Sequence, residues 1–441
     1  MVIYMMDAIW EQVQLPRFPN VRGNIKTDVL IVGGGLTGLL CAWRLKQAGI
    51  EYVLIEADRI CCRTTGHTTA KITSQHGLVF DKILRRYGPE IAKIYYDAGE
   101  SALVEFGRIC EKLDCDFERK DSYIYSLDSQ EKLEHELRTL EKLGANAYFA
   151  DKLKVPFRTA GAVCFPDQAQ FHPLKFASAI AADLKIMERT PARAFDGNTV
   201  LTDYGKITAQ KIIVATHFPL INKHGLYFMK QYQSRSYVLA LANAAQVDGM
   251  YRDEAEDGFS FRNYGNTLLL GGGAHRTGKS EGWGELEAAA RRWYPASRVQ
   301  YRWAAQDCMT LDGLPYIGRY SRHSSELYVA TGFNKWGMTS AMVASMILVD
   351  QVQGKQSPFA PAFSPQRSSL HPQLAVNMLE SVINLLTPKT PRCPHMGCAL
   401  KWNPYERSWD CSCHGSRFSE EGKVLDNPAN SNMKNPPESC I

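Results

Sequence analysis

The sequence has no long apolar run, no export signal and no strong charge of either sign. No apolar stretch approaches the ~18 residues that span a bilayer, and residues 1–14 lack the charged start and apolar core of a signal peptide. The net charge is +5 over 441 residues, and no basic run exceeds three residues. These absences argue against a membrane span, an exported protein and a nucleic-acid partner.

The remaining composition is that of an ordinary globular protein. Hydrophobic residues make up 45% of the chain and charged residues 22%, which are typical values. The length suffices for two or three domains, and no internal repeat is found. Seven of the twelve cysteines are scattered without the spacing of a disulfide framework (Cys41, Cys61, Cys62, Cys110, Cys115, Cys164 and Cys308). Scattered thiols without an export signal indicate a reducing cytoplasm.

Two short boxes near the C-terminus combine cysteine with histidine. The first contains Cys393 and His395, and the second, after fifteen intervening residues, contains Cys411 and His414. Two thiolates and two imidazoles are the ligand set of a Rieske 2Fe–2S centre, in which the cysteines hold one iron and the histidines the other. The boxes therefore predict a cluster that transfers single electrons.

A structural zinc ion is the alternative, because two cysteines and two histidines also suit tetrahedral zinc. A zinc finger, however, places both cysteines in one pair and both histidines in the other, whereas each box here holds one of each. Two further cysteines, Cys398 and Cys413, lie within the boxes and have no use in a zinc finger. The arrangement favours the iron–sulfur cluster.

The boxes closely resemble those of the Rieske proteins of respiratory bc-type complexes. That resemblance implies four ligands and a disulfide that links the two cluster loops (ligands Cys393, His395, Cys411 and His414; disulfide Cys398–Cys413). Ser412 stands where the family usually has proline. The chain ends 27 residues after His414, so the module has few supporting strands. So small a unit must lean on the larger domain or on a partner, and metal ligation supplies part of its folding energy.

A second motif lies near the start of the chain. A buried-strand pattern over 27–32 leads into a Gly-rich turn and an amphipathic helix, and the next strand ends on Glu56. This is the dinucleotide fingerprint in its strand–turn–helix context. Gly33 permits the tight turn, Gly35 lets the backbone approach a pyrophosphate, and Gly38 allows the helix to pack on the strand. Glu56, 23 residues after Gly33, is placed to accept hydrogen bonds from the adenosine ribose.

Further segments, far apart in the chain, have patterns that are expected at the same nucleotide-binding site. They are a small polar loop, two hydrophobic strands, a Pro-containing turn and the start of a long helix (63–70, 211–216, 327–332, 312–318 and 333–339). A NAD domain would be contiguous. This order resembles the D-amino-acid oxidase superfamily of flavoenzymes, which includes glycine oxidase, sarcosine oxidase and dimethylglycine dehydrogenase. The resemblance covers roughly 25–353 and implies FAD.

The resemblance implies an α/β fold class with an α+β cap. A Rossmann-like FAD-binding domain is expected to carry an inserted mixed-sheet substrate domain, followed by a small, incomplete, β-rich Rieske module. We expect the oxidoreductase domain over 25–356, a linker over 357–384 and the Rieske module over 385–441. Within the first, the FAD-binding parts are about 25–75, 160–222 and 305–356, and the cap about 76–159 and 223–304.

The predicted FAD contacts come from the glycine turn, the acidic strand end, the polar loop and the final helix. They are Gly33, Gly35, Leu36, Thr37, Gly38, Glu56, Thr65, Gly66, His67, Thr68, Thr216, Gly332, Gly337, Met338 and Thr339. In the dimethylglycine dehydrogenase branch, a histidine in a loop similar to that of His67 is bonded covalently to the flavin. A plain polar-loop role is favoured for His67, and a loop role rather than a catalytic one for His217.

A second Gly-rich stretch, over 268–276, could suggest a separate NADPH site. The next helix begins only near Glu281, and no strand ending in an acid follows about 20 residues later, as the fingerprint requires. A strand of the substrate domain that faces the flavin is therefore favoured.

Members of the oxidase superfamily remove a hydride from a carbon next to nitrogen. Flavin accepts two electrons together and releases them singly, and a Rieske centre is a suitable one-electron acceptor. The prediction is an FAD dehydrogenase of a small amine or amino acid that passes electrons through the cluster to an unidentified external acceptor. Arg262, His275 and Lys335 are weak candidates for substrate contacts or catalysis. A surface salt bridge explains Arg262 equally well.

Two other functions are alternatives to this prediction. The chain could be an electron-transfer module that relays electrons for a partner protein, in which case the flavin face would be open rather than enclosed by a cap. A Rieske oxygenase would need a mononuclear iron site with two histidines and a carboxylate, and no segment of this chain has room for that domain.

Overall fold

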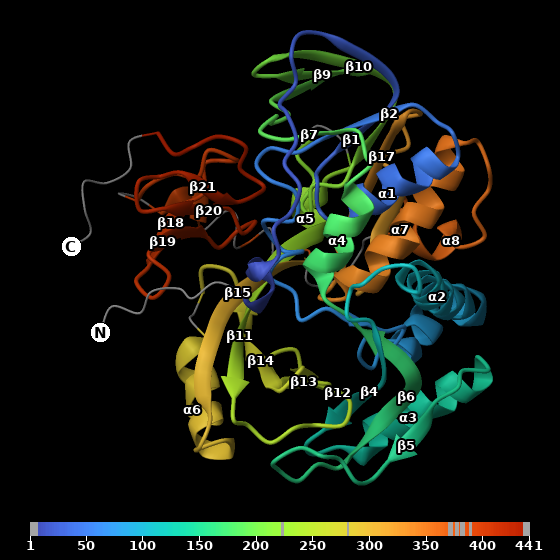
Figure 1. The fold of residues 1–441 in the computed structure, drawn as a ribbon, viewed down its shortest axis with the longest axis vertical. Coiled ribbons are helices and arrows are strands. Elements are labelled where there is room, and N and C mark those ends of the chain that lie inside the picture. The colour runs from blue at the N-terminus through green and yellow to red at the C-terminus, as the bar shows by residue number, and fades with distance from the viewer. Residues whose placement is uncertain are drawn as a thin grey trace.

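The computed structural model describes residues 8–221, 225–279, 282–368, 374, 379, 384–387 and 390–434. Within them the chain forms three sheets, which Figure 1 shows as an upper sheet, a lower sheet and a small red module at one side. Among the helices of these residues, none combines the length and apolar character that crossing a membrane requires.

The first sheet is the nucleotide-binding type that the fingerprint predicts. Its path runs β16 (Tyr316–Arg319), β17 (Leu327–Thr331), β10 (Gly205–Val214), β1 (Ile25–Val32), β2 (Tyr52–Ile55) and β7 (Ile186–Met187), with β8 (Ala194–Asp196) and β9 (Thr199–Thr202) attached at β10. The central strands are parallel, and Val32 pairs with both Val214 and Ile55. Since β1, β2 and β10 end at the same level, the loops that follow these strands meet at one edge of the sheet, where such folds bind ligands.

Helices α1 (Leu36–Gln47) and α7 (Gly337–Val352) cover this sheet, and α4 (Pro173–Ala181) packs beside α1. Helix α1 packs on α7, as Figure 1 shows, and it buries Leu39, Leu40 and Leu45 completely. Each fully buried leucine stabilises the fold by about 1.5–3 kcal/mol. This packing fixes the start of α1, and therefore the glycine turn before it, at the edge of the sheet.

The second sheet is the mixed sheet of the predicted cap. Its path runs β15 (Arg298–Thr310), β11 (Gln231–Ala242), β14 (Thr267–Arg276), β13 (Ser260–Tyr264), β12 (Met250–Asp253), β4 (Glu118–Ser126), β6 (Gly161–Gln170) and β3 (Lys71–Ile72), with β5 (Tyr148–Ala150) beside β6. Strands β4 and β12 are parallel and the other neighbours antiparallel. The Gly-rich stretch over 268–276 lies in β14, which confirms it as a strand of this sheet.

The helices of this half are α2 (Phe80–Cys110), α3 (Gln130–Lys142) and α6 (Trp283–Trp293). Helix α2 is kinked at Gly88, which has φ 85° and precedes Pro89; proline within a helix breaks its hydrogen-bond ladder. The structure also contains η1 (Ile9–Gln12), α5 (Tyr227–Lys230) and α8 (Ala360–Phe363).

The domain boundaries stay predictions, but three strands fall differently from the predicted division. Strand β6 lies within the expected flavin-binding part 160–222 and β3 within the part 25–75, yet both are strands of the second sheet, as is the end of β15 beyond residue 305. The reason is pairing: β6 bonds to β4 along its whole length, a long-range contact that the local pattern does not contain.

The third sheet is a small antiparallel meander at the C-terminal end, formed by β18 (Leu400–Asn403), β19 (Ser408–Cys411), β20 (Arg417–Ser419) and β21 (Val424–Asp426). Part of the expected linker over 357–384 lies outside the described residues. Figure 1 shows the module beside the first sheet and the strands β11 and β15 of the second.

Candidate functional site

A cavity of about 480 Å³ lies between the edge of the first sheet and the face of the second. Most of the predicted FAD contacts line it: Gly33, Gly35, Leu36, Thr37, Glu56, Thr65, His67, Thr68, Thr216, Gly337 and Met338. They come from the segments that sequence analysis linked to one nucleotide. The volume is within the range of ligand and cofactor sites.

The glycine turn fits a pyrophosphate group. Gly33 has φ 114°, and a Cβ there would lie 2.5 Å from the carbonyl oxygen of Ala215; a Cβ on Gly38 would lie 1.9 Å from the oxygen of Gly33. At Gly35 the nearest atom to such a Cβ is Oγ1 of Thr65, at 3.4 Å. Gly33 and Gly38 therefore permit close packing, whereas Gly35 faces the cavity. Gly35 is also the N-cap of α1 and makes no side-chain cap bond, so the helix start can offer N–H groups to phosphate.

Glu56 ends β2 at the cavity wall. Its Oε2 accepts a hydrogen bond from the amide of Gly34 (2.6 Å), and its Oε1 accepts one from Asp58 (2.9 Å). Burial raises the pKa of Glu56, and these two backbone donors oppose that shift. The carboxylate oxygens are thus fixed next to the glycine turn, where the ribose of a dinucleotide is expected. The contact with ribose stays a prediction.

The remaining predicted FAD contacts lie behind the cavity wall. A Cβ on Gly66 would lie 2.6 Å from the oxygen of Cys61, and one on Gly332, at φ 73°, would lie 2.2 Å from Cγ2 of Thr310. Thr339 Oγ1 donates to the carbonyl of Thr73 (2.7 Å) and accepts from its amide (3.1 Å). These residues, like Gly38, do not line the cavity; they pack and hydrogen-bond behind the residues that do.

The cap contributes charged groups that sequence reasoning missed. Lys71, Arg252 and Asp307 line the cavity together with the predicted Lys335. Lys71 Nζ donates to the carbonyl of Tyr251 (3.0 Å), and Lys335 Nζ donates to that of Glu256 (3.1 Å). Three basic side chains and the carboxylate of Asp307 thus line this part of the site. A charge in the middle of a short strand, as in β12, is the only local signal for Arg252.

Burial controls the protonation of these groups. It lowers the pKa of Lys335 to about 8, with Arg252 adding to the shift and Asp307 opposing it. Burial likewise lowers the pKa of Lys71 well below its usual value, and it raises the pKa of Asp307. Perturbed groups in a cavity are typical of functional sites.

Of the three weak candidates, only Lys335 lines the cavity. Arg262 is 1% exposed, and its Nη1 donates to the carbonyls of Thr69 (2.7 Å) and Ala70 (2.9 Å). Arg262 is therefore not at the surface, and it does not line the cavity. Its guanidinium instead connects the chain before β3 to the cap. His275 lies outside the cavity wall as well, with Nε2 3.0 Å from the hydroxyl of Tyr237.

Two histidines occupy the wall. His67 Nδ1 lies 2.8 Å from the carbonyl oxygen of Arg63, and its Nε2 lies 3.6 Å from Oε1 of Glu11. His217 lies in the loop after β10, as predicted, and also lines the cavity. Its Nε2 is buried without a hydrogen-bond partner. Burial lowers the pKa of His217.

The predicted cluster ligands lie together in the module. Cys393, Cys411 and His414 are at most 2% exposed, and the rings of His395 and His414 are 5.0 Å apart at 86°. Nδ1 of His414 is buried and has no hydrogen-bond partner. Burial lowers the pKa of His395 to about 3 and that of His414 to about 4. Neutral imidazoles are the form that binds metal, so the donor set fits a 2Fe–2S cluster.

The predicted disulfide is not formed in the structure. Cys398 and Cys413 are buried free thiols whose sulfur atoms lie within 4.8 Å of one another and of the sulfur of Cys411. A bond needs about 2.05 Å. The residues are thus adjacent, and the bridge stays a prediction.

The histidine side of the cluster site faces the larger domain. The ring of Phe218 lies 6.3 Å from that of His395 and 6.4 Å from that of His414, and Phe228 lies 6.0 Å from His414. Phe218 directly follows His217, which lines the cavity. One short segment therefore connects the cavity wall with the cluster histidines.

Comparison with known families agrees with this geometry. The family model of FAD dependent oxidoreductases matches residues 28–351, and that of the Rieske [2Fe-2S] domain matches residues 389–437. The chain belongs to the FAD-dependent oxidoreductase family of the D-amino-acid oxidase type and carries a C-terminal Rieske domain. It is an enzyme whose fold implies FAD and whose C-terminal domain implies a 2Fe–2S cluster, as predicted.

Individual relatives show both parts. The chain is 31% identical to YhfW of Bacillus subtilis (strain 168), described as a Rieske 2Fe-2S iron-sulfur protein, over 96% of each chain. It is 24% identical to the gamma-glutamylputrescine oxidoreductase of Escherichia coli (strain K12), over 78% of this chain and 87% of that protein. The structure of glycine oxidase from Geobacillus kaustophilus covers 78% of this chain and 99% of its own, with a TM-score of 0.64 and 18% identity, which shows a shared fold.

Proposed function

We propose that the chain oxidises a C–N bond of a small amine or amino acid and passes the electrons singly to the Rieske cluster and then to an external acceptor. Bound FAD supplies hydride acceptance from carbon, and a Rieske cluster supplies one-electron transfer. The chain's own residues position the substrate and join the two sites. The observation that carries the proposal is the placement of the cluster histidines against the wall of the flavin cavity.

The charged groups of the cap support an anionic substrate. Lys71, Arg252 and Lys335 line the cavity together with the carboxylate of Asp307. A guanidinium can bind a carboxylate through two parallel hydrogen bonds. Arg252 and Lys335 would hold the carboxylate of an amino acid, and Asp307 would attract its ammonium group.

The cap also argues against a relay for a partner protein. Strands β11, β12, β13, β14 and β15 each contribute residues to the cavity wall: Ser236, Arg252, Ser260, Gly271 and Asp307. A cap over the flavin side admits a small molecule and separates the cavity from another protein. The activities that two similar proteins are named for, gamma-glutamylputrescine oxidoreductase and glycine oxidase, support the same substrate class.

We place the reaction in a reducing cytoplasm. The seven cysteines outside the cluster boxes are free thiols. Thiols without disulfides are typical of that compartment. Fractionation of cells that produce the natural protein, followed by immunodetection, tests this placement.

Anaerobic rapid mixing with a panel of amines and amino acids tests the function. The expected result is bleaching of the flavin absorption, followed by the EPR signal of the reduced cluster. The proposal is wrong if no amine or amino acid bleaches the flavin, or if the flavin is reduced and the cluster stays oxidised.

A further inference from the structure

We propose that the Rieske module supplies one wall of the FAD site, so that FAD binding and docking of the module stabilise each other. The inference goes beyond amine oxidation and does not depend on it, because its tests measure FAD binding and module docking rather than turnover.

The first observation is the composition of the cavity wall. Strand β21 and the segment that follows it contribute Val424, Asp426, Asn427, Ala429, Asn430 and Asn432 to the same cavity as Gly35 and Glu56. These residues come from the cluster module, more than 300 positions after the glycine turn. A nucleotide held by that turn would therefore be enclosed in part by the module.

Hydrogen bonds from side chains to backbone carbonyls hold residues 427–430 against the flavin domain. The side-chain amide of Asn427 donates to the backbone carbonyls of Thr216 and Phe218, and the backbone carbonyl of Asn427 accepts from Nε2 of Gln233 (2.8 Å). Nη1 of Arg193 donates to the carbonyl of Asn430 (2.7 Å). Thr216 is itself part of the wall, so the module and the flavin domain share one continuous surface there.

Two glutamines of the second sheet hold the second cluster box. Gln233 Nε2 donates to the carbonyl of His414 (3.1 Å), and Gln306 Nε2 donates to that of Gly415 (2.8 Å) and to Oε1 of Gln233 (2.9 Å). Both glutamines are nearly fully buried. Gly415 has φ 84°, and a Cβ there would lie 2.5 Å from Cβ of Gln233. The cluster loop thus fits closely on strands β11 and β15.

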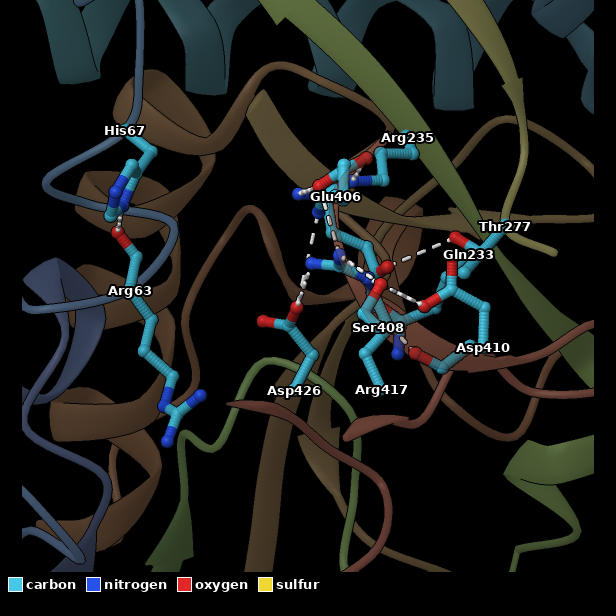
Figure 2. A network of polar contacts seen from close by, with 12 residues as sticks. Arg63, His67, Gln233, Arg235, Thr277, Glu406, Ser408, Asp410, Arg417 and Asp426 are labelled. Atoms are coloured by element: carbon cyan, nitrogen blue, oxygen red, sulfur yellow. Dashed lines mark hydrogen bonds and ion pairs between the residues drawn. The ribbon is translucent and has the colours of Figure 1, made fainter. Parts of the chain in front are cut away.

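A buried ion network joins the same surfaces, and Figure 2 shows its members around Glu406. Nε of Arg235, on β11, donates to Oε1 of Glu406 (2.6 Å), and Nη2 of Arg417 donates to Oε2 (2.8 Å). Arg417 also binds Asp410 (2.9 Å) and Asp426 (3.1 Å). Burial alone would raise the pKa of Glu406, but the two guanidinium groups lower it to about 2.

The network extends to the cavity through Asp426. Arg417 holds this carboxylate by a hydrogen bond, and Asp426 lines the cavity while Glu406 and Arg235 do not. Removing one partner of a buried ion pair leaves the other charge without compensation. A change at Glu406 should therefore loosen the docked module, and any effect on FAD must pass through docking.

The first test is Glu406→Gln, because an amide cannot neutralise both Arg235 and Arg417. The matched control is Glu287→Gln, which removes the carboxylate that pairs with the buried Arg302 (3.2 Å) on the same sheet, away from the module. Each variant is purified from riboflavin-starved cells and titrated with FAD, and its iron content per chain is measured. We expect about tenfold weaker FAD binding in Glu406→Gln, equivalent to about 1.4 kcal/mol. The control Glu287→Gln should bind FAD with unchanged affinity. Equal affinity in the two variants would overturn the proposal.

The second test uses the unaltered chain, in case Glu406→Gln loses its cluster. Hydrogen exchange is compared between FAD-free and FAD-loaded protein that both retain iron. Since coupling between two binding events is reciprocal, removal of FAD should increase exchange in β20 and β21. The exposed cap helix α3 serves as the reference and should not change. Identical exchange of β20 and β21 in both forms would contradict the proposal.

Discussion

In the flavin domain, α1 buries Leu39, Leu40 and Leu45 against α7 and the first sheet, within a large apolar core. In the cluster module, four of the nine buried core residues are cysteines of the two boxes, Cys393, Cys398, Cys411 and Cys413. The first region is held by apolar burial and can keep its fold without a cofactor. The second has little apolar surface to bury, so metal ligation and docking must supply the rest.

The largest expected effect is on the module. Cys411→Ser removes a predicted iron ligand that is fully buried, and we expect iron to fall from about two per chain to near zero. Because ligation contributes to folding, strands β19 and β20 should lose protection against hydrogen exchange. The helical signal in the far-UV circular dichroism spectrum should be unchanged. Cys62→Ser, at an exposed thiol, is the control and should retain its iron; equal iron in both variants would refute the ligand assignment.

A matching change in the flavin domain is Gly38→Ala. The added methyl group would lie 1.9 Å from the carbonyl of Gly33, so the turn must shift. We expect a loss of about 3 kcal/mol in unfolding free energy together with loss of FAD, measured by denaturation and by the absorption spectrum.

Gly144→Ala is the comparison for that variant. Gly144 has a positive φ of 71°, unlike the helical Gly38, but a Cβ there meets no atom within 4 Å. It should cost about 1–2 kcal/mol and keep FAD. If Gly38→Ala retained FAD with full affinity, the fit of the glycine turn to the pyrophosphate would be wrong.

Within the flavin domain, the cavity cations should affect substrate binding and not folding. Arg252→Met is expected to raise KM for a carboxylate substrate about 10–100-fold, since a hydrogen bond to a charged group contributes about 1.5–3 kcal/mol. Steady-state kinetics with the amino acid found in the screen provides the measurement. Arg298→Met, at an exposed position of β15, should leave KM unchanged. Similar KM values for all three proteins would exclude Arg252 from substrate binding.

The smallest expected effect is a pH dependence from Lys335. Burial lowers the pKa of this ammonium to about 8, so the cation is present below pH 8 and is lost as the pH rises through that value. KM for a carboxylate substrate should be constant below pH 8 and rise above it. Lys335→Arg, which stays charged throughout, should remove the inflection. An unaltered inflection in this variant would assign it to another group.

Much of the fold and of the cluster site could be predicted from local patterns. The ligands Cys393, His395, Cys411 and His414 lie in two short boxes, so their spacing alone indicates the chemistry. The glycine turn is similarly local, and the order of strands and helices gave the class of fold, which the structure and the family comparison confirm. The individual contacts to FAD stay predictions.

The placement of Lys71, Arg252, Arg262 and Asp307 was beyond the sequence. Arg262 was a candidate for substrate binding, but the pairing of β13 in the second sheet turns its guanidinium toward the chain before β3. Lys71 and Arg252, from strands far apart in the chain, line the cavity instead. Which side of a sheet faces a cavity depends on register and twist, which the alternation of residues along one strand does not reveal.

The sequence by itself determined the two kinds of site, because metal ligands and glycine turns act through neighbouring residues. Only the tertiary structure decided how the sites meet. The contacts of Gln233 with His414, and of Arg235 with Glu406, join residues 181 and 171 positions apart. Such contacts depend on how two folded surfaces fit, and no local pattern of charge or hydrophobicity encodes that fit.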